Sequence, residues 1–336
     1  MNHRPRRRPV LGLLAGLLLT SCVAGEESAD SSAKDGGDTV RVRLDWAYYN
    51  PESLVLKEKG WLEEALAAKG AEVTWTQSLG SNKANEHLRA DVVDFGSTAG
   101  TPALLARANG TPLRTVYVYS QPEWSSLVVT KDSPIASVAD LKGRRIAATK
   151  GTDPYFFLLQ ALRTAKLDAR DVTVVNLQHA EGRTALERGQ VDAWAGLDPY
   201  LSQSQIDSGT RLVYRNPGFN SYGVLNVREE FLKEHEGLAQ VVVDQYERAR
   251  RWILANEEEM RAILSRTAGI TPAVAERQLS ERTRFDIDPV PGRDQARVLG
   301  RVVPFLVTDG LVTSEKSARD ALRTLFAPHL AERASR

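Results

Sequence analysis

The sequence of 336 residues has a single cysteine, Cys22, and no long hydrophobic run. One cysteine cannot form a disulfide bond within the chain, so the stability of the fold must come from packing. The most apolar stretch, 10–19, carries no charge, but it is far too short to cross a bilayer of about 30 Å as a permanent helix. These two absences exclude a disulfide-stapled scaffold and a permanent span in this stretch.

Catalytic and metal-binding patterns are also scarce. The histidines form no pair at i and i+4, and no carboxylate cluster has the spacing of metal ligands. The chain has no Gly-x-Ser-x-Gly elbow and no Gly-x-x-x-x-Gly-Lys-Ser/Thr loop. The sequence therefore favours a protein that is not an enzyme and that uses no cofactor or metal.

The N-terminal segment has the order of a secretory signal. Four arginines between positions 4 and 8 precede the apolar run, which ends in Leu-Thr-Ser-Cys at 19–22 with a small residue before the cysteine. This order predicts a signal peptide over residues 1–21 and resembles the lipobox of bacterial lipoproteins, in which the cysteine is lipidated and becomes the new N-terminus. An ordinary signal sequence cut nearby is the main alternative. Either reading places the mature chain outside the cytoplasm.

The mature chain is mildly acidic and begins with a polar segment. Loss of residues 1–21 removes four arginines and changes the formal charge from +1 to −3. The mature chain therefore lacks the excess of positive charge that is typical of proteins that bind nucleic acid. Residues 22–38 contain no aromatic side chain and cannot bury enough surface to offset the entropy of ordering. We therefore expect a flexible tether there, held at the membrane by a lipid on Cys22.

After residue 38, short β-branched runs alternate with helical patterns, which indicates an α/β fold with mostly parallel strands. We expect strands at 40–44, 73–76, 92–95, 115–119, 126–130, 145–149, 172–177, 191–194, 212–214 and 222–227. We expect helices at 52–69, 82–90, 102–108, 154–165, 181–188 and 199–204. The pattern from Arg228 onward predicts helices at 229–256, 260–266, 272–282, 295–306 and 314–326, and no further strand.

Three stretches, taken in order, carry a family resemblance. They are VDFGSTAG at 93–100, a region from KDSPI at 131–135 through VADLKGRRIA at 138–147 to KGTDP at 150–154, and GQVDAW at 189–194 followed by DPY at 198–200. The ordered set resembles the solute-binding proteins of bacterial ABC importers in the sulfonate, nitrate and taurine group. It is most similar to aliphatic sulfonate-binding proteins, over about residues 39 to 310.

The resemblance implies a two-lobed fold of the type II periplasmic-binding-protein kind. Lobe one would comprise 39–119 plus 222–336, including the helical C-terminal segment, and lobe two would comprise 120–221. The implied function is capture of a small organic anion between the lobes and its delivery to an ABC permease and its ATPase. Receptors for taurine, nitrate or a pyrimidine precursor remain as alternatives, as do a pyrimidine-biosynthesis enzyme of the same fold and a structural or sensory lipoprotein.

Two segments could form an anion site. A helix N-terminus offers unpaired N–H groups and a partial positive charge, and small residues before a helix let the backbone approach an anion closely. The turn expected at 96–100 adds the hydroxyls of Ser97 and Thr98, and the turn at 151–153 adds that of Thr152. Both segments could also be ordinary strand-to-helix connections.

The remaining candidates have a second interpretation as well. Asp153 could cap the following helix or meet the cationic part of a zwitterionic ligand, and Asp198, which matches an acidic position of the family, could be a helix cap. Trp46 and Tyr48 follow the first strand, where they would form either the wall of a site or part of the core. The predicted ligand-binding residues are Trp46, Tyr48, Ser97, Thr98, Ser126, Gly151, Thr152, Asp153 and Asp198.

Overall fold

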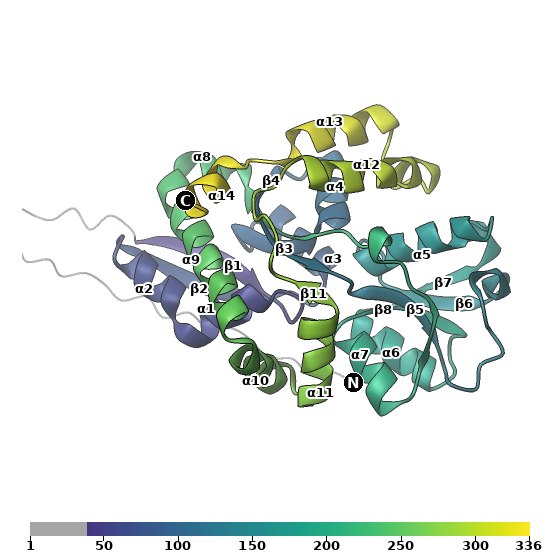
Figure 1. The fold of residues 1–336 in the computed structure, drawn as a ribbon. Coiled ribbons are helices and arrows are strands. Elements are labelled where there is room, and N and C mark those ends of the chain that lie inside the picture. Colours follow the sequence, from purple (N-terminus) through teal and green to yellow (C-terminus); the bar gives the residue numbers. More distant parts are fainter. Residues whose placement is uncertain (1–38) are drawn as a thin grey trace, which may run out of the picture. The chain divides into compact units, whose positions relative to one another are not determined.

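A computed structural model describes residues 39–336 of the chain (Figure 1). The predicted signal peptide, the lipidated Cys22 and the tether at 22–38 lie outside the described residues. Residues 39–336 contain two β-sheets that are covered by helices. Within this range, no helix combines the length and the hydrophobicity that a membrane span requires.

The larger sheet has six strands in the order β11-β4-β10-β3-β1-β2. Its strands are β1 (Val40–Trp46), β2 (Ala71–Gln77), β3 (Phe95–Ala99), β4 (Leu113–Pro122), β10 (Gly223–Arg228) and β11 (Thr283–Arg284). β1 pairs in parallel with β2 and β3, whereas β10 lies between β3 and β4 and is antiparallel to both. The chain therefore leaves this sheet after β4 and returns to its centre about a hundred residues later.

The smaller sheet has five strands in the order β7-β6-β8-β5-β9. Its strands are β5 (Ser125–Val129), β6 (Arg145–Ala148), β7 (Thr173–Asn176), β8 (Ala193–Leu197) and β9 (Arg211–Tyr214). β6 is parallel to β7 and β8, and β5 is antiparallel to β8 and β9. The predicted α/β class with two sheets is confirmed, with the refinement that antiparallel β5 and β10 make both sheets mixed.

The helices follow the strands in the alternation that the sequence predicted. Before β10 they are α1 (Pro51–Lys59), α2 (Trp61–Ala67), α3 (Ser81–Arg89), α4 (Gly100–Ala108), α5 (Asp153–Thr164), α6 (His179–Glu187) and α7 (Tyr200–Asp207). After β10 they are α8 (Glu229–Glu234), α9 (Glu236–Ala255), α10 (Glu257–Ala268), α11 (Pro272–Glu276), α12 (Arg293–Thr308), α13 (Glu315–Leu325) and α14 (His329–Ala334). A π-helical turn at Arg277–Glu281 joins α11 to β11.

Three details of the prediction are wrong. The helix expected at 52–69 is two helices, because Gly60 takes a left-handed conformation with φ of 67° that ends α1. The helix expected at 229–256 is also divided, at His235. A strand does return after Arg228, since Thr283 and Arg284 pair with the end of β4. Two residues carry no periodic pattern, so only this pairing reveals the strand.

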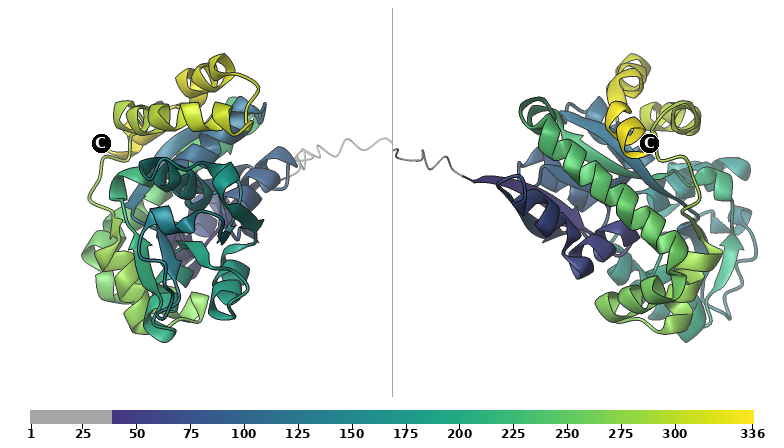
Figure 2. Two further views of the ribbon diagram at one scale, coloured as in Figure 1. Left: turned by 90° about the vertical axis from the view of Figure 1, so that its right-hand side faces the viewer. Right: turned by 60° about the vertical axis from the view of Figure 1, so that its left-hand side comes forward.

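The C-terminal helices pack on the elements of the larger sheet, as predicted. α9 contacts α1, α2 and β4, and Figure 2 shows this long green helix running across the elements that it covers. α12 and α13 contact α4 and lie beside it in Figure 1. One hydrophobic cluster includes Leu104 of α4, Leu299 of α12 and Phe157 of α5, so the core continues from one set of elements into the other.

Candidate functional site

The N-termini of three helices meet between the two sheets. α3 starts at Ser81 after β2, whereas α5 and α6 start after β6 and β7 of the smaller sheet. A Cβ atom on Gly80 would lie 2.9 Å from Nε2 of His179, and one on Gly151 would lie 3.5 Å from Cβ of Asn82. We call these residues, 80–82, 151–153 and 179, the helix junction. Its backbone N–H groups and partial positive charges suit a small anion.

His179 of the helix junction lies beside Gly80 and is 1% exposed. Its Nδ1 atom is 3.1 Å from Oγ1 of Thr149, and its Nε2 atom is buried without a hydrogen-bond partner. Burial lowers its pKa to about 3. The sequence analysis did not select this residue, although its position at the first turn of a helix directly after a strand was a usable signal.

Asp45 lies near the end of β1 and holds the hydroxyl of a predicted site residue. Its Oδ1 atom accepts hydrogen bonds from the backbone N–H and from the hydroxyl of Ser97, both at 2.8 Å. Its Oδ2 atom is buried without a partner, and burial raises the pKa of this carboxyl to about 7. The Ser97 hydroxyl is therefore committed to Asp45.

The turn expected at 96–100 is a strand. Residues Phe95–Ala99 form β3, and α4 begins at Gly100. Ser97 and Thr98 pair with β10, and Oγ1 of Thr98 donates to the carbonyl of Ala99 at 2.8 Å and accepts from Nδ2 of Asn226 at 2.8 Å. The prediction of an anion cradle in a loop at this position is wrong, because β10 pairs with these residues and makes them part of the sheet.

Asp153 connects the start of α5 to the two segments that cross between the sheets. Its carboxylate accepts from the backbone N–H and hydroxyl of Ser221 at 2.8 and 2.7 Å, and from Nε1 of Trp124 at 3.0 Å. Burial raises its pKa. No side chain among the described residues caps α5, since Oγ1 of its N-cap residue Thr152 donates to the carbonyl of Thr149. The N–H of Asp153 therefore keeps its capacity for an anion, whereas Pro154 has no N–H and that of Tyr155 donates to the carbonyl of Thr152 at 3.1 Å.

Asp198 caps a helix and also forms an ion pair between elements of the two sheets. It accepts from the backbone N–H of Ser202 at 2.8 Å, which caps α7. It also lies 3.3 Å from Nη1 of Arg282, and the two side chains are only 2% and 10% exposed. Burial raises the pKa of Asp198, and Arg282 opposes this effect. Arg282 directly precedes β11 and was not selected from the sequence.

Of the aromatic candidates, Trp46 is the last residue of β1 and Tyr48 follows it by two positions. Trp46 and Tyr48 are half-buried and contact each other edge to face at 5.7 Å, with Nζ of Lys57 5.5 Å from the Trp46 ring. Tyr49, which was not predicted, is buried, and its ring meets that of Trp124 at 6.0 Å. The buried aromatic contact with Trp124 is therefore made by the neighbour of Tyr48, the residue that the sequence suggested.

Ser126 is placed inside the smaller sheet. It is 2% exposed and pairs with Gly196 across β5 and β8. The Tyr49 hydroxyl donates to the carbonyl of Ser97 at 3.1 Å, on the larger sheet. Of the nine predicted residues, the consecutive residues Gly151, Thr152 and Asp153 belong to the helix junction, and the other six lie outside it.

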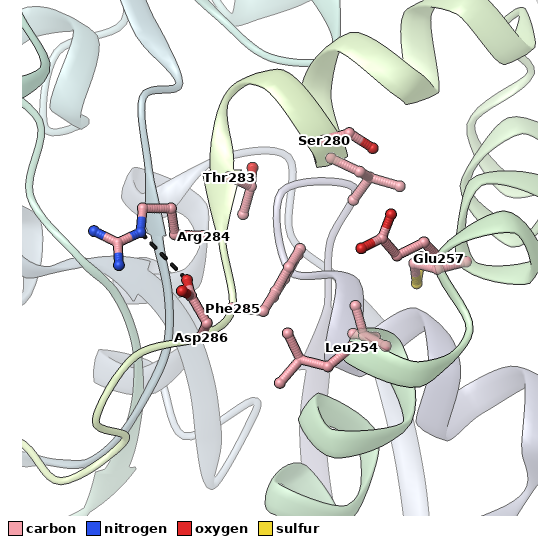
Figure 3. Close-up of a pocket in the computed structure, with 10 residues that line it drawn as sticks. Leu254, Glu257, Ser280, Thr283, Arg284, Phe285 and Asp286 are labelled. Carbon is pink, nitrogen blue, oxygen red and sulfur yellow. Dashed lines mark hydrogen bonds and ion pairs between the residues drawn. The ribbon is translucent and has the colours of Figure 1, made fainter.

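A cavity of about 430 Å³ lies away from the helix junction, between α9, α10 and β11 (Figure 3). Its wall includes Leu254, Glu257, Met260 and Phe285, and Arg284 points toward Asp286 at its edge. None of the nine predicted ligand-binding residues lines it. Residues 39–336 also contain no group of three His, Cys, Asp or Glu side chains arranged to hold a metal ion.

Comparison with known proteins agrees with the resemblance seen in the sequence. Residues 52–260 match the family described as NMT1/THI5 like. The putative aliphatic sulfonates-binding protein of Escherichia coli strain K12 is 31% identical over 280 residues, which span 82% of this chain and 84% of the relative. The protein of the same description from Bacillus subtilis strain 168 is 30% identical over 185 residues, or 54% of this chain and 56% of the relative.

The fold is also similar to solved structures. The alkanesulfonate-binding protein SsuA from Xanthomonas axonopodis pv. citri, bound to MOPS, has a TM-score of 0.76 and 25% identity, covering 85% of this chain and 98% of that one. The desulfurization enzyme DSZB has a TM-score of 0.66 at 19% identity, with 88% and 99% of the two chains covered, and this likeness concerns the fold alone. By family match and by identity to its relatives, the chain belongs to the NMT1/THI5-like family.

Proposed function

We propose that the chain is an extracytoplasmic substrate-binding protein that captures an aliphatic sulfonate and delivers it to an ABC importer. The observation that carries this proposal is the helix junction, where N-termini from both sheets face one another. The name of the Escherichia coli relative and the MOPS bound to the Xanthomonas protein support a sulfonate as the ligand. The proposed role is binding without catalysis.

The proposed mechanism is closure of two lobes around the ligand. Lobe one is 39–119 plus 222–336, and lobe two is 120–221. The ion pair of Asp198 with Arg282 joins the two lobes, so it would stabilise the closed form. A ligand that touches both lobes shifts the population toward that form, which the permease would recognise.

The helix junction matches the chemistry of a sulfonate. A sulfonate spreads one negative charge over three acceptor oxygens, and the uncapped N–H of Asp153 at the start of α5 is a donor for such an oxygen. The ligand would thus be held by dipoles and hydrogen bonds.

Anchoring at the membrane is a further part of the proposal. A lipid on Cys22 and a tether over 22–38 would keep the receptor close to its permease and raise the effective concentration at this partner. A single acyl chain binds a membrane only weakly, so stable anchoring requires more than one. Mass spectrometry of the mature N-terminus tests this part, and an unmodified thiol would contradict it.

Isothermal titration calorimetry with ethanesulfonate, taurine, nitrate and a pyrimidine tests the function. We expect saturable binding of one sulfonate per chain. Gly80→Ala should weaken that binding, because a Cβ atom would come within 2.8 Å of Oδ1 of Asn82 and 2.9 Å of Nε2 of His179. Gly237→Ala, whose Cβ would meet open space, is the matched control and should bind as the wild type does. If no sulfonate binds, the proposal fails.

A further inference from the structure

His179 belongs to lobe two but lies against the start of α3 in lobe one. A Cβ atom on Gly80 would be 2.9 Å from Nε2 of His179 and 2.8 Å from Oδ1 of Asn82, so both side-chain atoms border the same small region. Both atoms are buried and neither has a hydrogen-bond partner. Two unpartnered polar atoms therefore face the contact between the lobes.

The hydrogen bonds of Thr149 determine which nitrogen of the ring carries the proton. The Thr149 hydroxyl has one hydrogen, which it donates to the carbonyl of Leu177 at 2.7 Å. It can therefore only accept from Nδ1 of His179, at 3.1 Å. In the neutral ring Nδ1 carries the hydrogen and Nε2 presents a lone pair. A second proton would be added at Nε2, on the side that faces the start of α3.

The closed form offers this second proton no counter-charge. Burial alone accounts for the low pKa of His179, so no charged side chain in residues 39–336 contributes to it. The ionisable residues of the helix junction and of neighbouring positions are Asp153, Lys83, Lys150 and Glu181. Asp153 is buried and its carboxylate accepts from Trp124 and Ser221, whereas the other three are half-buried or exposed. When the lobes separate, the ring reaches water, and its pKa returns to about 6.5.

We propose that protonation of His179 disfavours closure of the ligand-free protein and favours closure around a bound anion. Below about pH 6.5 the open form carries an imidazolium, and closing without a ligand would bury that charge uncompensated. A bound anion at the helix junction supplies the missing negative charge and accepts the Nε2 hydrogen. This inference rests on the proposed function, because it requires two lobes that close around an anion.

The sign of the pH dependence follows from linkage. In the open protein the ring has an ordinary pKa, and in the closed complex the anion raises it. Binding therefore takes up a proton at pH values between the two pKa values. In that range anion affinity falls by about tenfold for each pH unit as the pH rises, and below about pH 6.5 it is constant.

The test is the dissociation constant of ethanesulfonate from pH 5.5 to 8.5 for the wild type, His179→Gln and His179→Asn. The wild type should lose affinity above about pH 6.5, and the folded variants should show no such slope. His87→Gln is the matched control, because His87 lies on α3 near Ser78, outside the helix junction, and the slope should persist. NMR titration of His179 in the wild type needs no variant and should show a higher pKa with ethanesulfonate bound.

The possible outcomes distinguish failure of the role of His179 from failure of the proposed function. Sulfonate binding with the same affinity at every pH, or a slope that persists in both His179 variants, would overturn the role of His179 and leave the proposed function intact. Failure to bind any sulfonate at any pH would overturn both. An unchanged NMR titration of His179 on saturation with ethanesulfonate would also contradict the inference.

Discussion

Replacement of Asp45 by asparagine should remove a large pH dependence of stability. Burial raises the pKa of this carboxyl from 3.8 to about 7, which is a shift of about three units and corresponds to about 4 kcal/mol. The native state keeps its proton between pH 4 and 7, whereas the unfolded state has released it. The contribution of this group to the free energy of unfolding therefore falls as pH rises through this window.

Asparagine is neutral at every pH, so the free energy of unfolding of Asp45→Asn should not fall in this way as pH rises. At pH 8 the variant should be more stable than the wild type by about 3 kcal/mol, if the changed hydrogen bonding costs about 1 kcal/mol. At pH 4 the variant should instead be less stable than the wild type by about 1 kcal/mol. Urea unfolding at a series of pH values measures the difference.

Asp140→Asn is the matched control for this experiment. Asp140 lies on the surface, where hydrogen bonds from Ala136 and Ser137 lower its pKa, so its titration lies below the window. This variant should keep the wild-type slope between pH 5 and 8. If Asp45→Asn keeps that slope too, or if it is less stable than the wild type at pH 8, the assignment of a buried neutral carboxyl to Asp45 is wrong.

Two further substitutions test contacts within the fold. Arg282→Ala should lower the free energy of unfolding by about 3 kcal/mol, because it leaves Asp198 buried without its charged partner. Arg284→Ala removes an exposed ion pair and should change the free energy of unfolding by at most about 0.5 kcal/mol. Equal effects of the two substitutions in urea unfolding would contradict this expectation. Gly223→Ala should cost about 3 kcal/mol, because a Cβ atom there would overlap the ring of Tyr119. An unchanged melting temperature would show that β10 can move aside.

The local sequence pattern located most of the strands and helices but not all of their limits. The alternation at 145–149 predicted β6 well, since its residues are flanked by turn signals. The pattern at 92–100 was misread, because glycine and hydroxyl residues are typical of turns. These residues form a strand only because β10, more than a hundred positions away, pairs with them.

For the candidate site, too, the local sequence predicted positions but not tertiary contacts. Thr152 and Asp153 were found from their position before a helix, and they lie at the helix junction. Their hydrogen-bond partners could not be found, because Trp124 and Ser221 come from other parts of the chain. His179 was missed for a related reason, since its burial depends on the start of α3 packing against it. Local patterns give positions, whereas burial and pairing depend on the tertiary structure.

A crystal structure with ethanesulfonate bound tests the central claim most directly. The account predicts the sulfonate at the helix junction, with its oxygens accepting hydrogen bonds from backbone N–H groups at the starts of α3, α5 and α6 and with Nε2 of His179 facing it. A sulfonate found only elsewhere, for example in the cavity of Figure 3, would contradict the account.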